Sequence, residues 1–148
     1  MENCVFCRMV SGEIPVKKIY ESSKFFAILD QNPVTTGHTL LIPTAHYEKQ
    51  TNMPAEDQAE LGIALGAVVD LLNKYFGDNM NIVNTSGKFA SQSVPHYHIH
   101  LIPRHEGDRL WNKDKSRIVL DRSSGFERLS PSKEELTELA NKLIGDKQ

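Results

Sequence analysis

Apolar residues follow a helical period most clearly between residues 52 and 77. They recur at steps of three and four and form one stripe: Leu61, Leu65, Val68, Leu72 and Phe76. A stripe of this period is typical of a helix that lies on a core. Pro54 suits the first turn of such a helix, and Gly77 suits the position just past its end. The pattern predicts a helix over residues 54–76.

Two shorter segments also have helical features. Residues 4–10 predict a short helix that ends at Ser11-Gly12. A last helix is expected to begin near Ser130-Pro131, where Ser132 and Glu135 have the spacing of a capping box. Its apolar stripe would contain Leu136, Leu139 or Ala140, and Leu143.

Several apolar segments between turn residues are typical of strands. They are Ile19–Tyr20, Phe25–Leu29, His38–Ile42, Ile82–Val83 and Val94–Ile102. Residues 103–129 read as a loop, with Arg117–Leu120 as a candidate for one more short strand. Strands joined by turns, with one long helix and a C-terminal helix, predict an α+β fold with an antiparallel sheet of about five strands.

The composition agrees with one domain over residues 1–148. Apolar residues make up 39% and charged residues 24% of the chain, as in ordinary soluble proteins. No apolar run reaches the roughly 18 residues that a membrane span needs, and the first residues lack the basic and apolar parts of a secretory signal. A formal net charge of −2 favours neither nucleic acid nor membranes as partners. We therefore expect a cytoplasmic protein in which any phosphate site depends on local geometry.

Three of the six histidines lie within five residues, in the segment His96-Tyr97-His98-Ile99-His100. Alternate side chains of a strand share one face, at a spacing of about 6.6–6.8 Å. A strand would therefore place the three imidazoles on one side, and Tyr97, Ile99 and Leu101 on the other. Buried polar groups cost free energy unless they are paired, so the row indicates a functional site rather than tolerated core histidines.

A loop of small and polar residues, from Ser86 to Pro95, precedes these histidines. It offers hydroxyls, an amide side chain and backbone N–H groups, and Gly87 allows a tight turn. Such a loop can hold phosphate oxygens without net positive charge. Alone it would be an ordinary turn, but beside the histidine row it indicates a phosphate site.

The segment from Gly87 through Gln92-Ser93-Val94 to His96-Tyr97-His98-Ile99-His100-Leu101-Ile102 resembles the signature of the histidine-triad superfamily. Two upstream stretches agree with it in order and spacing: Asp30…Asn32-Pro33…Gly37-His38-Thr39-Leu40-Leu41-Ile42-Pro43…His46, and Cys4-Val5-Phe6-Cys7. The resemblance covers residues 4–104 and implies the HIT-like fold of the bacterial, nucleotide-binding branch. Tyr97 is bulkier than the usual aliphatic residue, and the resemblance does not extend to the C-terminal loop and helix, residues 105–148.

The resemblance implies a hydrolase or transferase that attacks the α-phosphorus of a purine nucleotide conjugate. The N-terminal cysteines are similar to those of the phosphoramidase-like branch. Pro103-Arg104 and Gly107-Asp108 resemble the dinucleoside polyphosphate hydrolases instead, and that activity is the first alternative. A nucleotide-binding module without turnover is the second.

The resemblance implies that the middle histidine, His98, is the nucleophile. A neutral imidazole attacks phosphorus through one ring nitrogen and forms a nucleotidyl-histidine intermediate, while its other nitrogen donates to an acceptor such as a backbone carbonyl. His100 would donate to a phosphate oxygen in the transition state. The family's remaining roles fall on Ser93 at the leaving group, Gln92 and Asn84 at phosphate oxygens, Asp30 at the ribose hydroxyls, Ile28 and Leu29 at the base, and His38 in support of the active-site histidines.

Cys4 and Cys7 are the two cysteines of the chain. Their spacing alone fits either half of a metal site or two small buried side chains. The resemblance implies a structural zinc held by Cys4, Cys7, His46 and His96, since zinc favours four such ligands, and no cofactor for the chemical step. A catalytic zinc on the three triad histidines is disfavoured, because neighbours on one strand face converge poorly on one ion.

The resemblance also implies a homodimer, formed through the long helix and an edge strand. Ala64, Gly66 and Ala67 of the predicted helix are small enough to allow close approach of a second helix.

Overall fold

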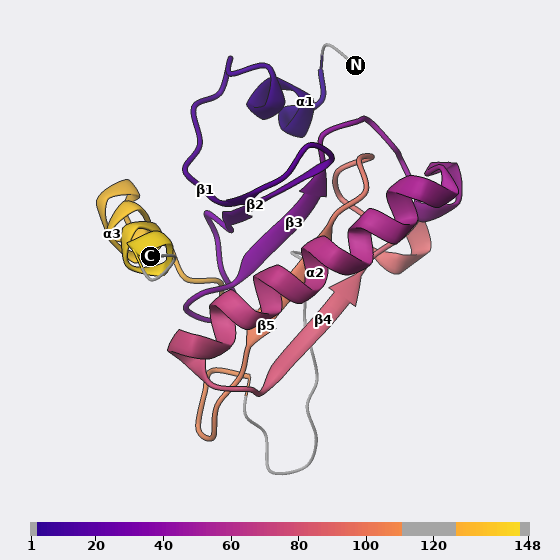
Figure 1. Ribbon diagram of the computed structural model, residues 1–148. Helices are drawn as coiled ribbons and strands as arrows, with labels where there is room; N and C mark the ends of the chain where they lie inside the picture. The colour runs from indigo at the N-terminus through magenta and orange to yellow at the C-terminus, as the bar shows by residue number, and fades with distance from the viewer. Residues whose placement is uncertain (1–2, 111–126, 146–148) are drawn as a thin grey trace.

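The computed structural model describes residues 3–110 and 127–145. A five-stranded antiparallel sheet with the strand order β1-β2-β3-β5-β4 forms its centre (Figure 1). The elements in chain order are α1 (Val5–Val10), β1 (Lys18–Glu21), β2 (Phe25–Leu29), β3 (Thr39–Pro43), η1 (Gln50–Asn52), α2 (Ala55–Phe76), β4 (Met80–Asn84), η2 (Lys88–Ala90), β5 (Ile99–Pro103) and α3 (Lys133–Gly145). The predicted α+β class with an antiparallel sheet is confirmed.

The central strands β2, β3 and β5 are buried along their whole length. Because side chains alternate across a strand, each strand contributes to two cores. Phe25, Ala27 and Leu41 pack toward α2, while Phe26 and Ile42 pack toward α1. The sheet therefore separates a large core under α2 from a smaller core under α1.

The predicted strand Val94–Ile102 is wrong at its start, because the strand begins only at Ile99. Pro95 has no N–H to donate to a neighbouring strand, and the N–H of Tyr97 bonds the carbonyl of Tyr47, in the segment after β3. The alternation nevertheless persists: Tyr97, Ile99 and Leu101 all lie in the core under α2. Arg117–Leu120 lies outside the described residues.

Helix α2 crosses one face of the sheet (Figure 1), as its apolar stripe predicts. Leu61, Val68 and Leu72 are buried, and Leu65 and Phe76 are partly buried against the same core. Pro54 lies one residue before the helix rather than in its first turn, and Gly77 ends the helix with φ of 80°. No helix of the described residues has the length and apolarity to cross a membrane.

The capping box predicted for α3 is present. The backbone N–H of Ser132 donates to the Glu135 carboxylate at 2.7 Å, and the N–H of Glu135 donates to the Ser132 hydroxyl at 3.1 Å. Ala140 and Leu143 are buried on the side of α3 that faces β1 and α2. These contacts fix the start of α3, just after the segment that reaches the site described below.

Candidate functional site

A cavity of about 250 Å³ opens on the α1 face of the sheet. Six of the predicted site residues line it: Ile28, Leu29, Asp30, Ser93, His98 and His100. Three side chains of α1 form the opposite wall: Val5, Phe6 and Met9. The lining therefore combines apolar side chains with hydroxyl, imidazole and carboxylate groups, which is the usual character of a small-molecule site.

His98 is held in one tautomer by the backbone. Its Nδ1 lies 2.7 Å from the carbonyl oxygen of His96, so Nδ1 carries the proton and donates it. Nε2 is then the nitrogen with a lone pair. The His98 ring packs against Phe6 of α1, with ring centroids 5.2 Å apart, and its own carbonyl accepts from Asn84 of β4 at 2.9 Å.

His100 has the opposite tautomer, which a chain of hydrogen bonds defines. The backbone N–H of Val34 donates to Nδ1 of His38 at 3.2 Å, so Nδ1 of His38 is an acceptor. Its protonated Nε2 then donates to Nδ1 of His100 at 2.9 Å. The proton of His100 is therefore on Nε2, where it can be donated to a bound oxygen.

Burial keeps these rings neutral. It lowers the pKa of His38 to about 2 and that of His100 to about 3, with smaller contributions from neighbouring imidazoles and from Arg128. Burial also lowers the pKa of His98. A neutral His98 retains the lone pair that a nucleophile needs.

The loop from Gly87 to Ser93 forms one rim of the cavity, where Ser91 and Ser93 line it. Gln92 holds this loop together: its Oε1 accepts from the Gly87 N–H at 2.6 Å, and its Nε2 donates to the Glu48 carbonyl at 2.8 Å. Gln92 and Asn84 therefore bond to the backbone around the cavity and are not among the residues that line it.

Asp30 lies at the end of β2, where its Oδ1 accepts from the N–H of Asn32 at 2.8 Å. Its Oδ2 lies 3.6 Å from Nε2 of His38 and 3.8 Å from Nη1 of Arg128. Arg128 lines the cavity, although it comes from the segment before α3. The sequence patterns missed Arg128, because nothing local marks an arginine in an irregular segment as a partner of a residue 98 positions earlier.

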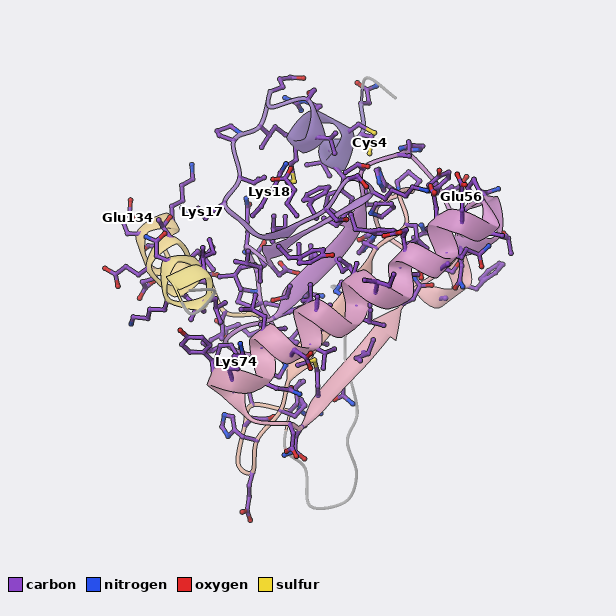
Figure 2. All side chains as sticks on the ribbon, in the orientation of Figure 1. Cys4, Lys17, Lys18, Glu56, Lys74 and Glu134 are labelled. Atoms are coloured by element: carbon purple, nitrogen blue, oxygen red, sulfur yellow. The ribbon has the colours of Figure 1, made fainter. Side chains whose placement is uncertain are left out.

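The four predicted metal ligands come together beside the cavity. Their ligand atoms, from Cys4, Cys7, His46 and His96, lie within 4.8 Å of one another, and Figure 2 labels Cys4 at the start of α1. Sγ of Cys4 is 3.3 Å from Nδ1 of His96, and Sγ of Cys7 is 3.3 Å from Nδ1 of His46. The edge between sulfur and nitrogen in a tetrahedral zinc site is about 3.6 Å, so the spacing fits a zinc ion.

The orientation of His96 also fits a metal ligand. Its Nε2 lies 3.0 Å from the carbonyl oxygen of Pro43, at the end of β3, so Nε2 carries the proton and donates it. Nδ1 then faces the two thiols without a proton, as a ligand nitrogen must. The three triad histidines do not converge on one point, because His96 faces the cysteines while Nδ1 of His98 is bonded to the backbone.

Arg104 and Asp108 form an ion pair. They belong to the motif that resembles the dinucleoside polyphosphate hydrolases. Arg104 Nε donates to the Asp108 carboxylate at 2.7 Å, and its Nη1 donates to Asn81 Oδ1 at 2.6 Å. Neither Arg104 nor Asp108 lines the cavity around His98. The pair fixes the turn after β5 against β4 and is no evidence for a particular substrate.

Comparisons with known proteins show the family to which the chain belongs. The family model described as the HIT domain matches residues 11–107. The chain belongs to the HIT domain family of histidine-triad proteins. A HIT-like protein of Methanocaldococcus jannaschii, named as uncharacterized, is 44% identical over 105 residues, which are 71% of this chain and 81% of the relative.

Two further relatives connect the histidine-triad fold to chemistry. An adenosine 5'-monophosphoramidase of Candida albicans is 33% identical over 107 residues, which are 69% of this chain and 70% of the relative. The crystal structure of a Zn-bound histidine triad family protein from Mycobacterium smegmatis matches with a TM-score of 0.76 at 33% identity, covering 98% of this chain and 95% of that one. Members of the histidine-triad family therefore include nucleotide hydrolases.

We expect His38 and His100 to remain neutral at pH 5, each with its proton on Nε2, because their pKa values are lowered to about 2 and about 3. Long-range ¹H–¹⁵N NMR of the imidazole rings at pH 7 and pH 5 measures this directly, with the urea-unfolded protein as control. The unfolded chain takes up protons on these rings near pH 6.5 and the folded chain does not, so the free energy of unfolding should decrease as the pH falls below about 6.5. An imidazolium signal from His100 at pH 5 would contradict the hydrogen-bond chain.

Proposed function

We propose that this protein is a nucleotide hydrolase or transferase of the phosphoramidase type, acting on conjugates of AMP through a nucleotidyl-histidine intermediate. The observation that carries this proposal is the pair of opposite tautomers in the cavity. His98 has its lone pair on Nε2, and His100 has its proton on Nε2. One ring is a nucleophile and the next is a hydrogen-bond donor, as a displacement at phosphorus requires.

In the first step, Nε2 of His98 attacks the α-phosphorus and forms a P–N bond. The bond from phosphorus to the leaving group breaks, its electron pair goes to the leaving atom, and that atom takes a proton through the Ser93 hydroxyl, which solvent reprotonates. His100 donates its Nε2 proton in a hydrogen bond to a non-bridging oxygen. In the second step water attacks phosphorus, loses a proton to solvent, and displaces His98 as neutral imidazole.

The rest of the cavity suits the nucleoside. Asp30 offers carboxylate oxygens that accept hydrogen bonds from ribose hydroxyls. Ile28 and Leu29 of β2, with Phe6 and Met9 of α1, offer an apolar slot for the base. The relative named as an adenosine 5'-monophosphoramidase supports an adenosine nucleotide as the first substrate to test.

Substitution of the nucleophile tests the mechanism. His98→Ala should lower AMP release from adenosine phosphoramidate by at least about 10³-fold, because loss of a covalent nucleophile removes the low-barrier route. AMP release is followed by anion-exchange chromatography. Quenching the wild type in alkaline detergent, with substrate labelled in its AMP part, should trap label on the protein, because the P–N bond of a nucleotidyl-histidine is stable in alkali and labile in acid. The matched control is His105→Ala, which removes an exposed histidine outside the cavity.

The same assay separates the alternatives. Faster release from diadenosine tri- or tetraphosphate than from the phosphoramidate would favour dinucleoside polyphosphate hydrolysis. Equal rates for wild type and His98→Ala would show that His98 is not the nucleophile. If the wild type binds AMP but releases none from any of these compounds, the protein is a nucleotide-binding module.

We also propose a structural zinc bound by Cys4, Cys7, His46 and His96. The supporting observations are the ligand spacing, the orientation of His96 and the Zn-bound relative. Four protein ligands would leave no open position, so the ion would link α1 to the segments before and after α2 and would activate no water.

Metal analysis tests the zinc site. The purified protein should contain about one zinc per chain, and both chelation and Cys7→Ser should lower the melting temperature, because ligand binding to the folded state stabilises it. His105→Ala should keep the metal. A protein that takes up no added zinc, with a melting temperature unaffected by chelators, would overturn this assignment.

A homodimer is proposed as well. Ile63 on α2 is 65% exposed, and Ile82 on β4, an outer strand of the sheet, is 48% exposed. Exposed apolar side chains on a helix and on a sheet edge are typical of surfaces that a second copy covers.

Charge placed on that surface tests the dimer. Ile63→Asp should shift the molecular mass measured by light scattering from dimer to monomer, because a buried unpaired carboxylate is costly. Val10→Asp, at an exposed apolar residue of α1, is the control and should remain dimeric. A monomeric wild type would exclude the proposed interface.

A further inference from the structure

Arg128 reaches the cavity from the segment that precedes α3. Two hydrogen bonds fix its position: the backbone N–H of Leu129 donates to the Pro33 carbonyl at 3.0 Å, and Nη1 of Arg128 donates to the Asn32 carbonyl at 3.1 Å. Both acceptors belong to the turn that follows Asp30. The C-terminal segment is therefore attached to the turn that orients the carboxylate of the cavity.

The same guanidinium stands at ion-pair distance from that carboxylate. Nη1 of Arg128 lies 3.8 Å from Oδ2 of Asp30, and each side chain is only 14% exposed. A carboxylate this far from bulk water is costly unless a positive charge compensates it. Among the described residues that line the cavity, no lysine or other arginine is present.

We propose that Arg128 is a positioning residue that orients the Asp30 carboxylate for the two ribose hydroxyls of the bound nucleotide. This inference rests on the proposed function and extends it to a segment that the histidine-triad signature does not include. The turn bond from Asn32 N–H holds Oδ1 at 2.8 Å, and Arg128 holds the other oxygen, so the carboxylate has one orientation. The site would thereby favour ribonucleotides over nucleotides that lack these hydroxyls.

A role through Asp30 differs from a direct role at the phosphate. Arg128 approaches Asp30, which directly follows β2, and its Nη1 donates to the carbonyl of Asn32 in the turn after Asp30. If it acts on the ribose, its loss should matter for every ligand with ribose hydroxyls, with or without a phosphate. If it acts on the phosphate, its loss should matter for AMP and for 2',3'-dideoxy-AMP alike, and should spare adenosine.

Binding measurements with three probes distinguish these cases. Isothermal titration calorimetry gives the Kd of AMP, adenosine and 2',3'-dideoxy-AMP for wild type, Arg128→Gln, Asp30→Asn and the double variant. Arg128→Gln should weaken AMP and adenosine about tenfold each, the size expected when a charge-assisted contact is lost. Dideoxy-AMP binding should change by less than about twofold, as its carboxylate-dependent contacts are absent. The double variant should bind AMP no more weakly than Asp30→Asn alone.

The matched control is Arg109→Gln. Arg109 donates to the Glu127 carbonyl and so holds the same segment from outside the cavity. This variant should bind all three probes like the wild type. Retained binding of dideoxy-AMP by Arg128→Gln also shows that this variant is folded.

Three outcomes would overturn the inference. Equal losses for AMP and dideoxy-AMP would assign Arg128 to the phosphate or to general stability. A ribose-dependent loss in Arg109→Gln as large as in Arg128→Gln would assign the effect to placement of the segment rather than to the guanidinium. A wild type that binds none of the probes would overturn the proposed function together with this inference. The first two outcomes would overturn the inference alone and leave the proposed function standing.

Discussion

The hydrogen bond from the His98 ring to the His96 carbonyl is the contact on which the geometry of the cavity depends. It leaves the lone pair of His98 on the nitrogen that faces the cavity. The position of that carbonyl depends in turn on the His96 ring, which donates to the Pro43 carbonyl and faces Cys4. The tautomer of His98 therefore depends on His96 and on the two groups that hold its ring, which are the cysteine pair at α1 and the carbonyl at the end of β3.

The second chain of hydrogen bonds needs burial as much as it needs geometry. If His38 were protonated, both of its nitrogens would be donors, and the Val34 N–H would lose its acceptor. Burial makes that charged form costly and so preserves the direction in which the protons point. Burial therefore contributes directly to the chemistry, because it withholds the hydration that would stabilise the charged form of these rings.

Much of this arrangement could be predicted from local patterns. The alternation of apolar and histidine residues placed Tyr97, Ile99 and Leu101 in one core. The spacing of Cys4 and Cys7 left a metal site as one of two readings, and it was the resemblance to the histidine-triad family that brought His46 and His96 into the cluster beside α1. The predicted start of β5 at Val94 was wrong. The N–H of Tyr97 bonds a carbonyl 50 positions earlier in the chain, and local sequence patterns do not show such a partner. The backbone partners of Gln92 and Asn84 could not be predicted for a related reason. A side-chain type shows the capacity to form hydrogen bonds, but tertiary structure supplies the partner.

The charge of the site also depends on which groups are hydrogen-bonded and which are buried. A protein with a net charge of −2 has no general attraction for nucleotides. A row of protonated histidines would supply positive charge, but it would remove the lone pair that attacks phosphorus. Neutral rings with fixed protons retain the nucleophile and still direct a donor at the developing charge. Among the described residues that line the cavity, Arg128 is the one arginine or lysine, and it lies beside the Asp30 carboxylate. Its positive charge is therefore placed to compensate that carboxylate, while the attacking nitrogen belongs to a neutral ring.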